Sequence, residues 1–168
     1  MRVRTARPSE AVLLGELGYA SWERSPIALA DAGRTDRPRL RSLFIDFCQN
    51  TADRILVAER DGVPAGWGAR ENADHEISDL WIGPAHQGTG CGTALLEALE
   101  AAIRNAGFDR AQLDVLEENR PAFAFYQRCG YTLVEQGERF SVSLGYRTKF
   151  RRLAKPLEAK PPVETDRA

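Results

Sequence analysis

The chain has 168 residues, of which 43% are hydrophobic and 28% charged, and its 23 Lys and Arg side chains nearly balance its 24 Asp and Glu. These values are ordinary for one soluble globular domain with a sizeable hydrophobic core. A formal net charge of -1 gives no reason to expect nucleic acid or an anionic membrane surface as a partner. No stretch approaches the roughly 20 apolar residues of a membrane span.

The cysteines and histidines indicate neither a disulfide framework nor a metal site. Cys48, Cys91 and Cys129 are odd in number and widely spaced, which fits a reducing cytoplasm better than an oxidising compartment. His75 and His86 have no partner at the spacing of metal ligands. We therefore expect a cytoplasmic protein that binds no metal.

Hydrophobic periodicity and turn signals predict both strands and helices along the chain. Asp61-Gly62, between two strand-like runs, is a strong two-residue hairpin signal. Asn105-Ala106-Gly107 is typical of a helix C-cap region. In chain order, we expect a strand at 2–6, a helix opening at 8–10 with Ser9 as N-cap, a helix at 36–48, strands at 54–60, 63–70 and 75–82, a helix beginning at 94, a strand at 111–116, a helix at 121–128, and strands at 131–135 and 146–153.

This order of elements predicts a mixed α/β domain built on one central sheet. We expect the domain to span 1–154 and the tail 155–168, which contains three prolines, to be disordered. The polar, glycine-containing segment 28–38 is either a mobile lid or a plain connector between helices.

The stretch Gln87–Thr93, which reads Gln-Gly-Thr-Gly-Cys-Gly-Thr, is the most informative part of the sequence. It lies between the apolar run Leu80-Trp81-Ile82 and the helical run that begins at Ala94. A glycine-rich turn from a strand into a helix leaves backbone N–H groups free at the positive end of the helix dipole. These donors predict a site for an anion, most often a phosphate.

Three interpretations of this turn can be weighed from the residues. A Walker A loop needs a Lys directly after its last glycine, and none is present here. A Rossmann fingerprint needs GxGxxG in a parallel βαβ unit, whereas the glycines here run GxGxG after three antiparallel-looking strands. An ordinary turn without a ligand stays open, although three glycines in five positions cost conformational entropy on folding.

Two sequence blocks resemble the GNAT acetyltransferase superfamily, whose members bind acetyl-CoA. The residues Gln87, Gly90 and Gly92 match its [Q/R]-x-x-G-x-[G/A] signature. The block Leu113–Tyr131 resembles the family pattern LxVxxxNxxAxxxYxxxGF, with Tyr in place of the usual Phe at its end. The two blocks have the family's order and spacing, and the resemblance covers 55–134; outside that range only the order of elements agrees.

The resemblance implies a fold and a cofactor site. The fold is a single α/β (α+β) domain with a mixed, mostly antiparallel central sheet whose splayed strands hold acetyl-CoA between them. The strand before the turn would pair with the pantetheine arm, and the Leu80 N–H would stabilise the oxyanion. Thr93 caps the helix, contacts phosphate, or both, and Asn119 either contacts CoA or caps the next helix. The implied cofactor-binding residues are Leu80, Trp81, Ile82, Gln87, Gly88, Thr89, Gly90, Cys91, Gly92, Thr93, Asn119 and Tyr126.

The resemblance also implies which groups move protons. Tyr126, seven residues after Asn119, has the position of the family's general acid, which protonates the departing thiolate. Two carboxylates are candidates for the base: Glu76, eleven residues before Gln87, and Asp114, five residues before Asn119. Many relatives use a chain of waters instead. The structural alternative for Tyr126 is a core aromatic residue, and for the carboxylates a solvated strand surface.

We therefore expect an N-acetyltransferase that moves acetyl from acetyl-CoA to a primary amine by direct attack in a ternary complex. A small-molecule amine is favoured over a protein N-terminus or lysine. A non-catalytic acyl-CoA-binding sensory module is the alternative from another functional class. The segments that set the acceptor in this family, here 12–48 and 137–146, carry no recognisable signature. Relatives often form dimers, so a homodimer stays open.

Overall fold

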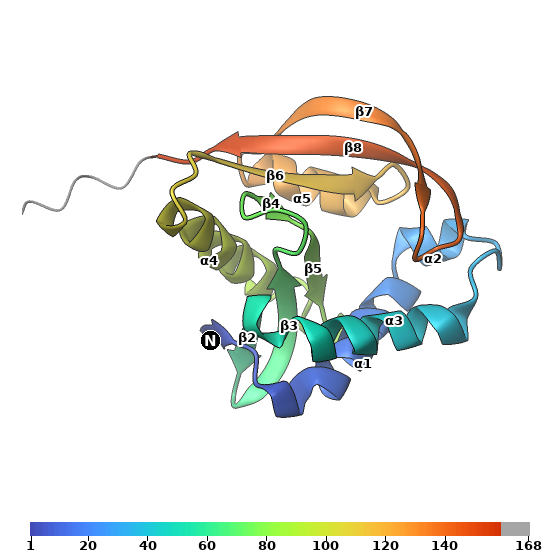
Figure 1. Ribbon diagram of the computed structural model, residues 1–168, viewed down its shortest axis with the longest axis horizontal. Helices are drawn as coiled ribbons and strands as arrows, with labels where there is room; N and C mark the ends of the chain where they lie inside the picture. The colour runs from blue at the N-terminus through green and yellow to red at the C-terminus, as the bar shows by residue number, and fades with distance from the viewer. Residues whose placement is uncertain (159–168) are drawn as a thin grey trace, which may run out of the picture.

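The computed structural model describes residues 1–158 and contains two four-stranded sheets that diverge from one shared segment (Figure 1). The first sheet is antiparallel throughout, in the order β1-β2-β3-β5. Its strands are β1 (Arg2–Thr5), β2 (Ile55–Arg60), β3 (Val63–Ala69) and β5 (Asp79–Ile82). The β2–β3 hairpin turns at Asp61 and Gly62, both with positive φ, which confirms the turn predicted there.

The second sheet has the order β4-β6-β8-β7. Its strands are β4 (Glu76–Ile77), β6 (Arg110–Leu116), β8 (Tyr146–Pro156) and β7 (Thr132–Ser141). Only β4 and β6 are parallel. The edge strand β7 is exposed along almost its whole length and therefore lacks the alternation of apolar and polar residues that marks a strand. For this reason the sequence predicts only its first few residues.

Helices cover both faces of the first sheet and one face of the second (Figure 1). The pair α1 and α3 packs on one face of the first sheet, and α4 packs on its other face and continues to the second sheet beside α5. The helices are α1 (Ala11–Glu23), α2 (Pro26–Ala30), α3 (Arg37–Asn50), α4 (Cys91–Asn105) and α5 (Arg120–Arg128), with short 3-10 turns at Pro8–Glu10, Ala52–Arg54 and Pro84–His86.

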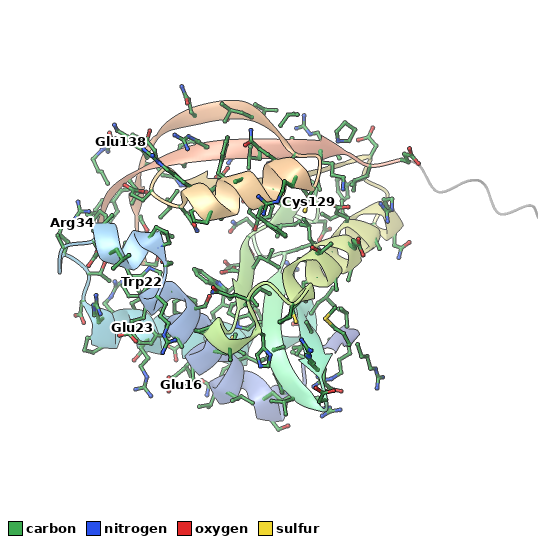
Figure 2. All side chains as sticks on the ribbon, turned by 180° about the vertical axis from the view of Figure 1, so that it is seen from behind. Glu16, Trp22, Glu23, Arg34, Cys129 and Glu138 are labelled. Carbon is green, nitrogen blue, oxygen red and sulfur yellow. The ribbon has the colours of Figure 1, made fainter. Side chains whose placement is uncertain are left out.

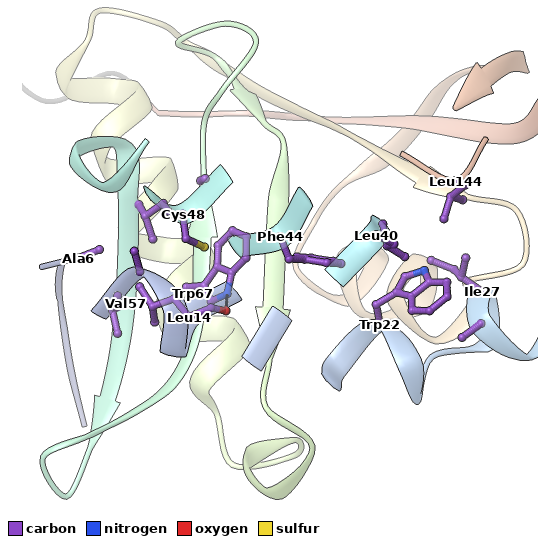
Figure 3. Packing of buried hydrophobic residues seen from close by; sticks show 14 residues of the cluster. Ala6, Leu14, Trp22, Ile27, Leu40, Phe44, Cys48, Val57, Trp67 and Leu144 are labelled. Atoms are coloured by element: carbon purple, nitrogen blue, oxygen red, sulfur yellow. Dashed lines mark hydrogen bonds between the residues drawn. The ribbon is translucent and has the colours of Figure 1, made fainter. Parts of the chain in front are cut away.

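A buried tryptophan of β3 ties the first sheet to α1. The Trp67 ring is fully buried, and its indole N–H donates to the Leu14 carbonyl at 2.7 Å (Figure 3). Phe47 of α3 stacks on the same ring with 5.7 Å between ring centroids. Cys48 and Phe44 extend this cluster along α3 (Figure 3). The first sheet is therefore held firmly by α1 and α3, and its far edge, β5, is fixed in position.

The segment 75–82, expected to be one strand, is divided between the two sheets, so that prediction is wrong. Ser78 separates β4 from β5 and binds the end of β3: its N–H and its hydroxyl both donate to the Ala69 carbonyl, at 3.0 and 3.2 Å. Ile77 and Leu80, three residues apart, both face the α4 side, so one residue is inserted into the alternation. At this insertion the two sheets part.

Several boundaries differ from those expected. Ser9 lies within a 3-10 turn, and Glu10 precedes α1. The segment 28–38 contains the end of α2 and a turn held by the fully buried Asp31, whose carboxylate accepts the Thr35 N–H at 3.1 Å. The strand β8 continues to Pro156, two residues beyond the expected boundary at 154. The rest of the predicted tail, 159–168, lies outside the described residues.

No helix within residues 1–158 is both long enough and apolar enough to cross a membrane.

Candidate active site

The divergence of the sheets leaves each of them with a strand edge that lacks a strand partner, and we call the region between these two edges of β5 and β6 the slot. The strand β5 is the last of the first sheet and pairs only with β3. On the other side, β6 pairs with β4 only at Gln112 and Leu113. From Val115 onward, the edge of β6 nearer β5 therefore has no strand partner among residues 1–158. An extended ligand can pair with such an edge as an added strand.

The direction of the β5 backbone groups follows from two hydrogen bonds. The Gly83 N–H donates to the Ala65 carbonyl at 2.9 Å, so this residue faces β3. The Ile82 carbonyl accepts a long bond, 3.5 Å, from the Gln87 side chain, so it faces away from β3. Because residues of an antiparallel strand face alternate sides, the backbone N–H of Leu80 also faces away from β3. Leu80 and Ile82 thus present their backbone groups to the slot.

The glycine turn stands at one end of this edge. Gly88 and Gly90 have φ of 72° and 87°, a left-handed conformation that favours glycine, and Gly90 is the N-cap of α4. The first intrahelical bond runs from the Ala94 N–H to the Gly90 carbonyl at 3.1 Å. The N–H groups of Cys91, Gly92 and Thr93 therefore precede the helical ladder and are free for a ligand. The turn has the geometry of an anion site.

The side chains of the turn contribute less than its backbone. Cys91 is buried, with its sulfur 3.2 Å from the Thr89 hydroxyl, so only its N–H reaches the turn surface. Thr93 is the third residue of α4 and not its cap, which leaves phosphate contact as the open alternative for its exposed hydroxyl. Asn119 caps α5, since its side-chain Oδ1 accepts the Ala122 N–H at 3.3 Å.

Tyr126 lies at the base of the slot. Its ring is 8% exposed and belongs to the buried cluster that contains Ile77 of β4 and Val115 of β6. The neighbouring Phe125 and Tyr131 pack edge-on against it, with centroids 5.1 and 5.7 Å away. Burial, and after it the negative charge of Asp79, raise the pKa of the Tyr126 hydroxyl. Tyr126 therefore keeps its proton at neutral pH and can donate it.

Asp114 has the surroundings of a structural carboxylate. It points to the face of β6 opposite Val115, and its oxygens accept bonds from Arg152 at 2.8 and 3.0 Å and from Arg139 at 2.5 Å. Burial would raise its pKa, but the hydrogen bonds and charges of the two arginines outweigh burial and lower it. A carboxylate held in this way is a weak proton acceptor.

Glu76 lies on the same face and accepts bonds from the side chains of Asn72 at 3.1 Å and Gln112 at 3.4 Å. The structure adds a third carboxylate, Asp79, which is absent from the sequence-based candidates. Its Oδ1 accepts the indole N–H of Trp81 at 2.9 Å. Burial raises the pKa of Asp79, and this effect outweighs the lowering by the hydrogen bonds from Trp81 and Ser78. Its position next to Leu80 is the signal from which the sequence alone could have identified it.

Comparison with known proteins agrees with this geometry. A family model described as "Acetyltransferase (GNAT) family" matches residues 20–131. The chain belongs to the GNAT acetyltransferase family. An uncharacterized N-acetyltransferase of Mycobacterium tuberculosis is 29% identical over 93 residues, which are 54% of this chain and 60% of that protein. The match thus spans less than two thirds of that relative.

Solved structures share the fold of this GNAT chain. A GCN5-related N-acetyltransferase from Rhodopseudomonas palustris has a TM-score of 0.77 at 21% identity, covering 93% of this chain and 95% of the other. A Salmonella typhimurium structure described with its cofactor acetyl-CoA has a TM-score of 0.64 at 18% identity, covering 98% of both chains. Identities this low show the fold alone.

The two GNAT sequence blocks lie on opposite walls of the slot. The signature at 87–92 forms the turn at the end of β5, and the block Leu113–Tyr131 forms β6 and α5. The turn and α5 are neighbours, because a Cβ added at Gly92 would lie 3.5 Å from the Phe125 ring. The motif residues that are separated in sequence therefore surround one slot.

Proposed function

We propose that this protein is an N-acetyltransferase that transfers the acetyl group of acetyl-CoA to a primary amine by direct attack in a ternary complex. One observation carries the proposal: the free edge of β5 leads into a helix N-terminus with three free N–H groups. An extended amide chain that ends in a pyrophosphate, as in CoA, matches a strand edge followed by an anion site.

The residues of the slot would supply both binding and activation. The N–H groups of Cys91, Gly92 and Thr93 would hold the pyrophosphate, and the backbone of Leu80 and Ile82 would pair with the pantetheine amides. The Leu80 N–H is then close to the thioester carbonyl and stabilises its oxyanion in the tetrahedral intermediate. The acetyl-CoA described in the Salmonella structure, on the same fold, supports this placement.

Tyr126 is the general acid of the proposed reaction. When the tetrahedral intermediate collapses, the C–S bond breaks and the CoA thiolate leaves with the electron pair. A protonated tyrosine at the base of the slot can give its proton to that sulfur. Burial raises the pKa of Tyr126, so the hydroxyl carries its proton when the thiolate forms.

We favour a small-molecule amine as the acceptor, because the acceptor side is bridged by hydrogen bonds. The Thr35 hydroxyl donates to the Leu144 carbonyl at 3.5 Å, and Arg39 donates to the Val142 carbonyl at 3.2 Å. These bonds join the segment after α2 and the start of α3 to the β7–β8 turn, which lies beside α2 in Figure 1. Trp22, labelled near these helices in Figure 2, is buried. A bridged site suits a compact amine better than an extended polypeptide.

Thermal unfolding with acetyl-CoA, NAD and ATP at matched concentrations tests the cofactor assignment. At about 100 times Kd, acetyl-CoA should stabilise the protein by roughly 2.7 kcal/mol, which raises Tm by roughly 5–10 °C for a domain of this size. NAD and ATP carry pyrophosphate but no pantetheine, so they should give a smaller rise. An equal or larger rise with either nucleotide would contradict the proposal.

A charge reversal at the turn separates binding from folding. Thr93→Glu places a carboxylate where the helix dipole favours it but where it repels pyrophosphate, so the fold should be kept and the acetyl-CoA shift lost. Ser9→Glu adds the same charge at the exposed start of the chain's first helical turn and should leave the shift intact. Release of free thiol with a panel of amines then measures transfer.

A further inference from the structure

Asp79 occupies the point at which the two sheets part. It is the first residue of β5, directly after the break at Ser78 and directly before Leu80. Its neighbour on the same face, Trp81, packs edge-on against Phe44 of α3 at 5.1 Å between centroids. The Asp79 carboxylate therefore lies on the α1–α3 side of the first sheet, and the core side of α4 is on the other. Asp79 is half-buried, so part of the residue remains open to an acceptor.

No cation pairs with Asp79 within residues 1–158, in contrast to Asp114. The titratable groups that face it are Tyr126 from α5, Cys48 from α3 and Glu71 from the segment after β3. Burial and the negative charge of Asp79 raise the pKa of Cys48 to about 12, so that thiol stays neutral. The carboxylate thus lacks a counterion, and the ammonium group of an acceptor would supply one.

The side chains of Trp81 and Ser78 both hydrogen-bond Asp79, and neither carries a charge. The Trp81 indole N–H donates to Oδ1 at 2.9 Å and fixes the orientation of the carboxylate. A base must be oriented toward the proton that it takes and must have a pKa near the working pH. Burial moves the pKa of Asp79 toward that range, whereas the two arginines move the pKa of Asp114 away from it.

We infer that Asp79 is the general base that deprotonates the acceptor amine, an inference that rests on the proposed acetyltransferase function. The acceptor binds as R–NH3+ beside the carboxylate and gives one proton to Asp79. The resulting R–NH2 attacks the thioester carbon: the C–N bond forms, and the carbonyl electron pair moves to the oxygen that faces the Leu80 N–H.

The remaining steps balance the protons. Collapse of the intermediate breaks the C–S bond, and the thiolate takes the proton of Tyr126. The tyrosinate takes the second proton from the nitrogen, which completes the amide, and Asp79 releases its proton to water. The products are the N-acetyl amine, CoA with a free thiol and one proton. The acid and the base then come from different elements, Tyr126 from α5 and Asp79 from β5.

The test uses Asp79→Asn in the full chain, assayed by free-thiol release from acetyl-CoA with benzylamine and with aniline. Asn keeps an acceptor for the Trp81 N–H, so the fold should be preserved. With benzylamine, which is a cation at neutral pH, kcat should fall roughly 10²–10⁴-fold, the range for a lost general base. With aniline, which is uncharged there, the fall should be much smaller. The acetyl-CoA thermal shift should be unchanged.

Controls and the pH profile decide between candidates. Asp74→Asn removes an exposed carboxylate five residues earlier and should leave turnover unchanged. Glu76→Gln tests the competing base. If kcat with benzylamine falls in Glu76→Gln by the amount expected for Asp79→Asn, and Asp79→Asn shows no fall, the inference is overturned. For the wild type, kcat/KM with benzylamine should fall as pH drops through the Asp79 pKa, and Asp79→Asn should lack this limb.

The two levels of failure are distinguishable. If the wild type releases no thiol with any amine of the panel, the acetyltransferase function fails and the role of Asp79 fails with it. If the wild type turns over and Asp79→Asn matches it with benzylamine, only the assignment of the base fails. An equal loss with both amines would indicate a positional role for Asp79 and would also overturn the inference.

Discussion

Asp79 on β5 and Asp114 on β6 are both aspartates on β-strands, but their electrostatic environments differ. Asp114 is on the strand face where Arg139 and Arg152 surround it, and both of its oxygens are bonded to guanidinium groups. Asp79 is at the slot, where the uncharged side chains of Trp81 and Ser78 hydrogen-bond it and no cation within residues 1–158 pairs with it. The family resemblance points to Glu76 or Asp114, whereas the proposal made from the surroundings is Asp79. The comparison teaches that two aspartates on neighbouring strands can have opposite pKa shifts when only one of them meets arginines.

Among the predictions that sharpen this comparison, the largest effect on kcat is expected for Tyr126, the proposed general acid. Tyr126→Phe removes the proton donor and should lower kcat roughly 10²–10⁴-fold with the acetyl-CoA shift unchanged. Tyr131→Phe is the matched control, because the Tyr131 hydroxyl is buried without a hydrogen-bond partner and the family usually has Phe there. Steady-state kinetics of the two variants check the prediction, and equal turnover in both would remove Tyr126 from the mechanism.

The next effect is on stability, and its sign should differ between the two aspartates. Asp114→Asn weakens three charge-assisted bonds and should cost about 1–3 kcal/mol, or a Tm lower by roughly 2–4 °C per kcal/mol. Asp79→Asn removes a carboxylate whose ionised form is disfavoured by burial, so it should raise Tm at neutral pH. A fall in Tm for both variants would show that the two surroundings are alike.

The pH dependence of stability follows from the same shifts. The lowered pKa of Asp114 means that its contribution is present above the unfolded pKa of about 3.9 and is lost as pH falls through the folded value. Because the pKa of Asp79 is raised in the folded state, the contribution of this residue to stability is fully present below the unfolded pKa of about 3.9. This contribution is lost as pH rises through the folded pKa. Both Tm differences from wild type should therefore shrink in acid, which unfolding scans from pH 7 downward will measure.

The smallest effect is expected from the residue that orients Asp79. The hydrogen bond from Trp81 lowers the pKa of Asp79 against the effect of burial. Trp81→Phe removes the N–H and keeps an aromatic ring against Phe44, so the acidic limb of kcat/KM should move to higher pH. A pH–rate profile checks this shift. An unmoved limb would mean that Asp79 does not control it.

The sequence predicts most of the elements because their signals are local. Asp36 caps α3 by accepting the Arg39 N–H at 3.0 Å, and Gly107, with φ of 92°, ends α4. The glycine turn is equally local, since Gly90 is both the motif residue and the helix cap. Comparison with known proteins confirms the family, and the splayed, mostly antiparallel sheets confirm the fold class.

The parts that the sequence does not predict depend on contacts between distant residues. The division of 75–82 at Ser78 requires the end of β3, because Ala69 accepts both of its donors. Asp114 pairs with Arg139 of β7 and Arg152 of β8, which are 25 and 38 residues away in the sequence. The place of Asp79 next to Leu80 can be read from the sequence, but its burial and its hydrogen-bond partners depend on the fold. Compartment, acceptor and oligomeric state stay predictions.

The break at Ser78 also sets the width of the slot. Because one segment belongs to both sheets, any change in the angle between them must rotate the backbone at this residue. The Ser78 hydroxyl donates to the Ala69 carbonyl and accepts the Glu71 N–H at 3.0 Å, so rotation would break several hydrogen bonds. These bonds therefore resist a change in the separation of the two walls, and a ligand that binds between them would have little of the Ser78 backbone left to order.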